Sequence, residues 1–143
     1  MLSACFSEPD CFSTATNNLK ITFRGAGKGA APKMSFSLIT ASGTETTFER
    51  KDSLSTLDIP VNPTASETTF ILTYGGVLDS VKVSRVDTLV VAYSTKTRII
   101  SPSCGADIYI TDLTVPATSF QKGVKVVNRQ LSTLATANLE IKL

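Results

Sequence analysis

The chain of 143 residues contains no histidine and no tryptophan. Histidine is the usual general acid or base near neutral pH and the commonest metal ligand. Catalysis would therefore have to rest on carboxylates, lysine or cysteine. The three cysteines include no C-x-x-C pair, and three cysteines without histidine do not match a zinc site. We expect a protein that is not an enzyme and that has no cofactor and no metal site.

Excess charge of one sign and long apolar runs are also missing. The 14 basic and 12 acidic residues give a net charge of +2, and the basic residues are scattered along the chain. Such a balance argues against a nucleic-acid partner. No run of about 20 apolar residues is present, so no segment is expected to cross a bilayer as a helix.

Serine and threonine are abundant, with 36 residues together. Threonine favours strands, and serine favours turns. Apolar residues alternate with polar ones, as in Leu19, Ile21 and Phe23, which is typical of half-buried strands. This alternation predicts about eight or nine short strands, at residues 19–23, 34–38, 54–59, 68–74, 81–83, 87–95, 108–110, 124–126 and 139–143.

Many short strands separated by turns predict an all-β fold. We expect an antiparallel β-sandwich of the immunoglobulin-like or a related type. A barrel around a ligand cavity is the alternative. A helical turn is the weakest expectation, at residues 129–137. One domain is predicted over residues 11–143, preceded by a tether over residues 1–10.

The cysteines bear on the cell compartment. Residues 2–5, L-S-A-C, match the processing site of a bacterial lipoprotein, which predicts a lipid on Cys5. The basic and apolar regions of a signal peptide do not precede this site, and we interpret the chain as trimmed or as read from a start codon that lies too far downstream. A lipid on Cys5 would explain the odd cysteine count and leave Cys11 and Cys104 to form a disulfide. The alternatives are a Cys5–Cys11 bond, or unpaired buried cysteines in a cytosolic protein.

Several segments together resemble a known family. They are L-S-A-C, the C-F at residues 11–12, L-D-I-P-V-N-P, D-T-L-V-V-A-Y and I-S-P-S-C-G-A-D-I-Y-I. They are similar to a family of small lipoproteins of unknown function from Bacteroidota. The resemblance implies a lipid on Cys5, a structural bridge between Cys11 and Cys104, and an envelope protein partner such as an outer-membrane barrel, whose gene often lies near genes of this family. It implies no activity.

These observations predict an outer-membrane lipoprotein of the bacterial cell envelope, facing the periplasm or the surface. We expect a non-catalytic structural or interaction module that contacts the membrane through Cys5. Tyr74, Tyr93 and Tyr109 fall in predicted strands and are candidate contact aromatics. The alternatives are a binding protein for a glycan or a small apolar ligand and, less favoured, a carboxylate-dependent hydrolase.

Overall fold

The structure is a computed structural model, and it describes residues 13–25, 34–41, 46–78 and 81–143. Within these residues it has nine strands and no helix, which confirms the all-β prediction. No helix in this part of the chain could span a membrane. The strands are β1 (Asn18–Arg24), β2 (Met34–Ala41), β3 (Thr46–Leu54), β4 (Thr56–Pro60), β5 (Glu67–Leu78), β6 (Val81–Ser101), β7 (Gly105–Thr118), β8 (Val124–Val126) and β9 (Leu139–Lys142).

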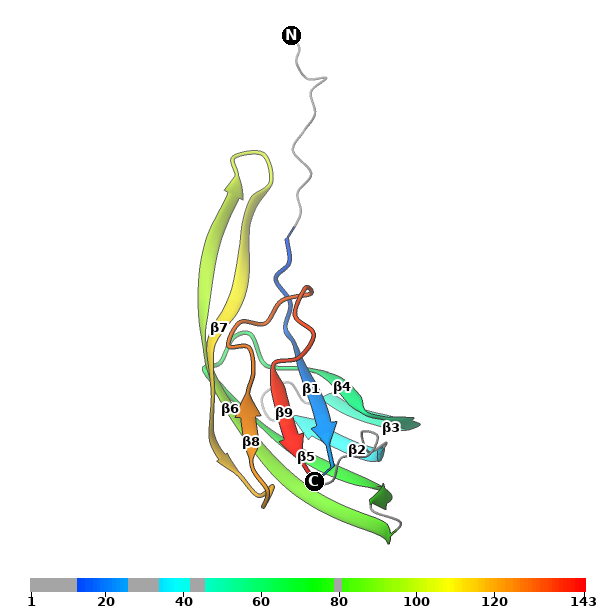
Figure 1. Cartoon of the computed structure of the whole chain (residues 1–143). Helices are drawn as coiled ribbons and strands as arrows, with labels where there is room; N and C mark the ends of the chain where they lie inside the picture. Colours follow the sequence, from blue (N-terminus) through cyan, green and yellow to red (C-terminus); the bar gives the residue numbers. More distant parts are fainter. Residues whose placement is uncertain (1–12, 26–33, 42–45, 79–80) are drawn as a thin grey trace.

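The strands form two sheets that pack as a sandwich (Figure 1). The smaller sheet has the order β4-β1-β9-β8, and the larger one has the order β3-β2-β5-β6-β7. The predicted β-sandwich is therefore confirmed over the alternative barrel. One pairing departs from the antiparallel expectation, because β1 and β9 run parallel. Both strands run in the same direction, and the hydrogen bonds between them are the slanted, evenly spaced bonds of a parallel pair.

The core is built from the alternating positions of the strands. Leu19, Ile21 and Phe23 have at most 1% of their surface exposed, while the residues between them are more exposed. Phe23 reaches from the smaller sheet to Phe36 of the larger sheet, with ring centroids 5.3 Å apart. The ring of Phe36 lies 5.7 Å from that of Tyr74. This row of aromatic rings joins the two sheets, because aromatic pairs at such distances add to the burial of apolar surface.

Three elements differ from the sequence predictions. β3 was not predicted, and the single strand expected at residues 54–59 is instead divided between the end of β3 and β4. β6 is one continuous strand of 21 residues rather than two separate strands at residues 81–83 and 87–95. Residues 129–137 form no helix. The N–H of Leu131 donates instead to the carbonyl of Ile110 on β7, at 2.9 Å, and the loop extends the sheet edge.

The β6–β7 hairpin projects beyond the sandwich (Figure 1). Its strands pair with each other from Ser94 and Thr111 to Ser101 and Gly105. Gly105 closes the turn with a φ of 77°, a conformation that glycine adopts without strain. Residues 94–111 of this hairpin are hereafter the arm.

The N-terminal segment docks on the arm before it enters β1. The hydroxyl of Ser13 donates a hydrogen bond to the carboxylate of Asp107 on the arm. Ala15 then forms a bridge with Ser132 in the loop before β9. From there β1 leads away from the arm and ends at Arg24, at the opposite end of the molecule (Figure 1).

Candidate functional site

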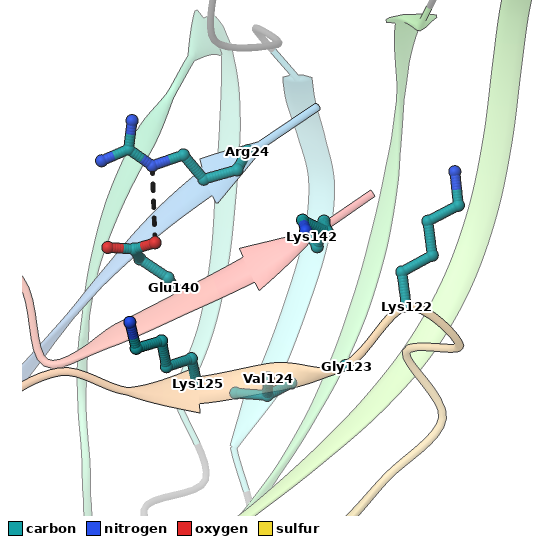
Figure 2. A pocket seen from close by; sticks show the side chains of 7 residues that line it. All are labelled: Arg24, Lys122, Gly123, Val124, Lys125, Glu140 and Lys142. Atoms are coloured by element: carbon teal, nitrogen blue, oxygen red, sulfur yellow. Dashed lines mark ion pairs between the residues drawn. The ribbon is translucent and has the colours of Figure 1, made fainter. Parts of the chain in front are cut away.

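A hollow of about 330 Å³ lies on the outer side of the smaller sheet, at the end away from the arm. Figure 2 shows its lining side chains on neighbouring strands. Phe23 and Ile141 point into the core, so alternation directs Arg24 on β1 and both Glu140 and Lys142 on β9 outward. The full lining, hereafter the basic hollow, is Arg24, Lys122, Gly123, Val124, Lys125, Glu140 and Lys142.

Strand register sets which of these charges are neighbours. Arg24 lies beside Lys142 in the parallel β1–β9 pair, and Lys125 lies opposite Glu140 in the antiparallel β8–β9 pair. The Nε atom of Arg24 is 3.6 Å from Oε1 of Glu140, the ion pair drawn in Figure 2. Lys122 is engaged elsewhere, since its Nζ donates to the carbonyl oxygen of Leu143 at 3.3 Å.

The basic hollow concentrates the positive charge of the protein. Arg24, Lys122, Lys125 and Lys142 against Glu140 give three net positive charges, compared with +2 for the complete chain. The remaining 10 basic and 11 acidic residues, out of 14 and 12, nearly balance each other. The basic residues are scattered along the chain, and the fold brings four of them together. Such a cluster can hold an oxyanion through charge-assisted hydrogen bonds.

A second polar cluster surrounds Asp87 on β6. The hydroxyl of Tyr74 donates to Oδ2 of Asp87 at 2.5 Å, and the hydroxyl of Ser119 donates to Oδ1 at 2.6 Å. Burial, and then the hydrogen bond to Asp87, raise the pKa of the Tyr74 hydroxyl well above its usual range. Both oxygens of this carboxylate are thus occupied within the fold, as expected of a structural acceptor. The adjoining hollow of about 280 Å³ shares Lys122 with the basic hollow.

The three tyrosines proposed as contact aromatics do not form one surface. Tyr74 is 1% exposed and Tyr93 is 5% exposed, so both rings belong to the core rather than to a binding face. The Tyr93 hydroxyl donates to the carbonyl of Asn62 at 2.6 Å. Tyr109 is half-buried on the arm, where the guanidinium carbon of Arg98 lies 5.8 Å from its ring centroid. Tyr109 is therefore the least buried of the three predicted contact aromatics.

The predicted cysteine sites are only partly covered by the structure. Cys5 and Cys11 lie outside the described residues, as does the tether over residues 1–10, so lipidation and disulfide pairing stay predictions. Cys104 is half-buried in the turn at the tip of the arm. Its N–H donates to the hydroxyl of Ser101 at 3.0 Å. No group of three or more metal-binding side chains occurs among the residues that the structure covers.

The sequence model of a family of unknown function, DUF6452, matches residues 37–143. The chain belongs to DUF6452. The matched stretch includes the arm of this DUF6452 protein and the β8 and β9 parts of its basic hollow. No curated protein and no solved structure matches the chain. Membership in DUF6452 confirms the prediction that the chain belongs to a family of unknown function. That the chain is a lipoprotein and that it comes from Bacteroidota stay predictions.

Proposed function

We propose that this DUF6452 chain is a lipid-anchored, non-catalytic interaction module of the bacterial envelope, with the lipid on Cys5. The hydrogen bond from Ser13 to Asp107 carries the proposal, because it ties the N-terminal segment to the arm. Cys5 precedes Ser13 by eight residues, and a fully extended residue spans about 3.3 Å. The lipid is therefore held within about 26 Å of the arm, and the arm lies at the membrane end.

A Cys11–Cys104 disulfide is part of this proposal. Cys11 comes two residues before Ser13, and Cys104 comes three residues before Asp107. The Ser13–Asp107 contact supports the pairing because it brings the two chain segments together near both cysteines. A bond there would fix the lipid-bearing segment to the arm, and it suits the oxidising compartments outside the cytoplasm.

The arm is the proposed contact surface for an envelope protein. Ile99 is 78% exposed and Ile108 is 55% exposed. They share one face of the arm, because Ile108 lies opposite Thr97 and Ile99 lies opposite Ala106. Two exposed isoleucines at the membrane end suit a partner that is itself embedded in the membrane, such as an outer-membrane barrel protein.

Ligand binding is the second candidate function, and the basic hollow is the observation that favours it. The hollow is polar, so it fits a charged or hydroxyl-bearing ligand, such as a glycan, better than a small apolar one. A two-carboxylate hydrolase is less favoured, since Glu140 is paired with Arg24 and both oxygens of Asp87 are bound.

Labelling of cells with an alkyne fatty acid tests the anchor. The protein should be expressed from its own gene with the upstream codons included. The wild type and Cys11→Ser are expected to incorporate the label and to fractionate with membranes, whereas Cys5→Ser should do neither. An unlabelled, soluble wild-type protein, or equal labelling of Cys5→Ser, would overturn the proposal.

A further inference from the structure

We infer that the basic hollow is a binding site for a phosphate group, held by Arg24, Lys125 and Lys142. The inference does not depend on a lipid at Cys5. The three cations come from β1, β8 and β9, which are neighbours in the smaller sheet. Figure 2 shows their side chains on one face of this sheet.

The spacing of the three cations fits an anion between them. Adjacent strands lie about 4.8 Å apart, and the partners of Arg24 and Lys125 on β9 are two residues apart, so Arg24 on β1 and Lys125 on β8 begin about 12 Å apart, on either side of β9. Long side chains that start at this separation can bring their donors to one central anion. The guanidinium group offers forked donors to two oxygens, and the ammonium groups act as point charges.

The charge of the site favours phosphate over a carboxylate. With Lys122 counted, four cations against Glu140 leave three positive charges, of which a phosphate dianion would neutralise two and a single carboxylate only one. Among the residues that the structure describes, neither Lys125 nor Lys142 forms an ion pair. Arg24 is paired only at 3.6 Å, and its side chain is 56% exposed. Such an exposed ion pair contributes little to stability, and its side chains can rearrange around a ligand.

The size of the site favours a phosphate that is attached to a larger group. The basic hollow, at about 330 Å³, is near the lower end of small-molecule sites and exceeds the needs of one phosphate. Lys122 also lines the adjoining hollow of about 280 Å³, together with Ser119 and Gln121. The Gln121 amide can accept or donate hydrogen bonds to a headgroup or a sugar on the phosphate.

Titration with inorganic phosphate, followed by the amide NMR shifts of Gly123, Lys125 and Lys142, tests the inference. Chloride at equal ionic strength is the reference. Lys125→Gln combined with Lys142→Gln is expected to weaken phosphate binding about fivefold or more. Glu140→Gln should tighten it, because it removes the one carboxylate of the site. Lys82→Gln is the matched control, since Lys82 is an exposed cation of the larger sheet and lies outside the hollow.

Vesicles distinguish the source of the phosphate. Binding to phosphatidylglycerol–phosphatidylcholine vesicles, but not to pure phosphatidylcholine vesicles, with the same loss in the double variant would identify a lipid headgroup. Binding of inorganic phosphate alone would identify a soluble phosphate compound. The inference is overturned if phosphate does not shift these amides beyond chloride, or if the double variant binds phosphate as well as Lys82→Gln does.

Discussion

The hydroxyl of Ser13 hydrogen-bonds to the carboxylate of Asp107, 94 residues further along the chain. Asp107 also accepts a hydrogen bond from Nη2 of Arg98 at 2.8 Å. Both contacts favour the ionised carboxylate, and the Ser13 hydroxyl followed by Arg98 lowers the pKa of Asp107 below its usual value. This group therefore holds the start of the fold against the arm.

Asp107→Asn is expected to release the N-terminal segment while the sandwich stays folded. The amide of Thr133 reports the release, because it donates to the carbonyl of Thr14 at 2.9 Å. Hydrogen exchange at this amide should become faster in Asp107→Asn and stay unchanged in Asp112→Asn. Asp112 is a suitable control, because it is exposed and asparagine tolerates its φ of 57°.

Acid should have the same effect on the wild type. A carboxyl whose pKa is lower in the folded protein contributes stability above its unfolded pKa of about 3.9, and this contribution is lost as the pH falls through the folded pKa. Protection of the Thr133 amide attributable to Asp107 is therefore expected at pH 5 and should decline as the pH falls below about 4. Equal protection across this range would contradict the role given to Asp107.

The Cys11–Cys104 bond would close a loop of nearly the whole domain. Chain-entropy arguments give such a bond about 4–5 kcal/mol, and native-state strain often lowers the measured gain. Replacing both cysteines by serine is expected to lower the free energy of unfolding by about 2–5 kcal/mol, as measured in urea. Cys5→Ser should leave this free energy unchanged. Non-reducing peptide mapping must find Cys11 and Cys104 in one fragment; a Cys5–Cys11 fragment would refute the pairing.

Asn138 is a buried polar residue that fixes the loop before β9. Its side-chain oxygen accepts from the N–H of Lys20 at 3.0 Å. Its side-chain nitrogen donates to the carbonyls of Asn128, at 3.2 Å, and Gln130, at 2.9 Å. Asn138→Ala would leave these groups unpaired, and unfolding in urea should show a loss of about 2–4 kcal/mol. The exposed Asn128 provides the control, since Asn128→Ala should cost at most about 1 kcal/mol.

The buried Tyr74 hydroxyl makes stability depend on alkaline pH. Its pKa is higher in the folded protein than in the unfolded chain, so its contribution is complete below pH 10 and is lost as the pH rises above that value. The free energy of unfolding should fall from pH 9 to pH 11, and Tyr74→Phe should make this fall shallower. Some dependence should persist, because burial also raises the pKa of Tyr93. An unchanged slope in Tyr74→Phe would refute the assignment to Tyr74.

The sequence predicts the strands whose two faces differ. In β1, Leu19, Ile21 and Phe23 alternate with polar residues, and the structure buries the three apolar side chains. β3 could not be predicted, because T-T-F-E-R-K-D-S-L has no such alternation. Its strand conformation depends on hydrogen bonds to β2. The polar segment S-T-K-T-R in β6 likewise has no apolar alternation, although it belongs to a strand that pairs with β7 along the arm.

The candidate site could not be predicted from sequence patterns, for a related reason. Arg24, Lys125 and Lys142 belong to three distant segments, and they become neighbours only through the parallel β1–β9 pairing and the antiparallel β8–β9 pairing. A charge count along the chain therefore shows balance where the fold concentrates charge. The burial of Tyr74 and Tyr93 was not predicted for a different reason. Alternation places both residues in strands, but it does not show which face of the sheet is covered.

Orientation at a membrane tests the central claim most directly. Lipidated protein is placed in vesicles that contain nitroxide-labelled lipid, with a fluorescent amino acid replacing either Ser103 at the tip of the arm or Gln121 beside the basic hollow. An anchor near the arm predicts strong quenching at position 103 and little at position 121. Equal quenching at both positions, or stronger quenching at position 121, would contradict a module that is anchored at its arm.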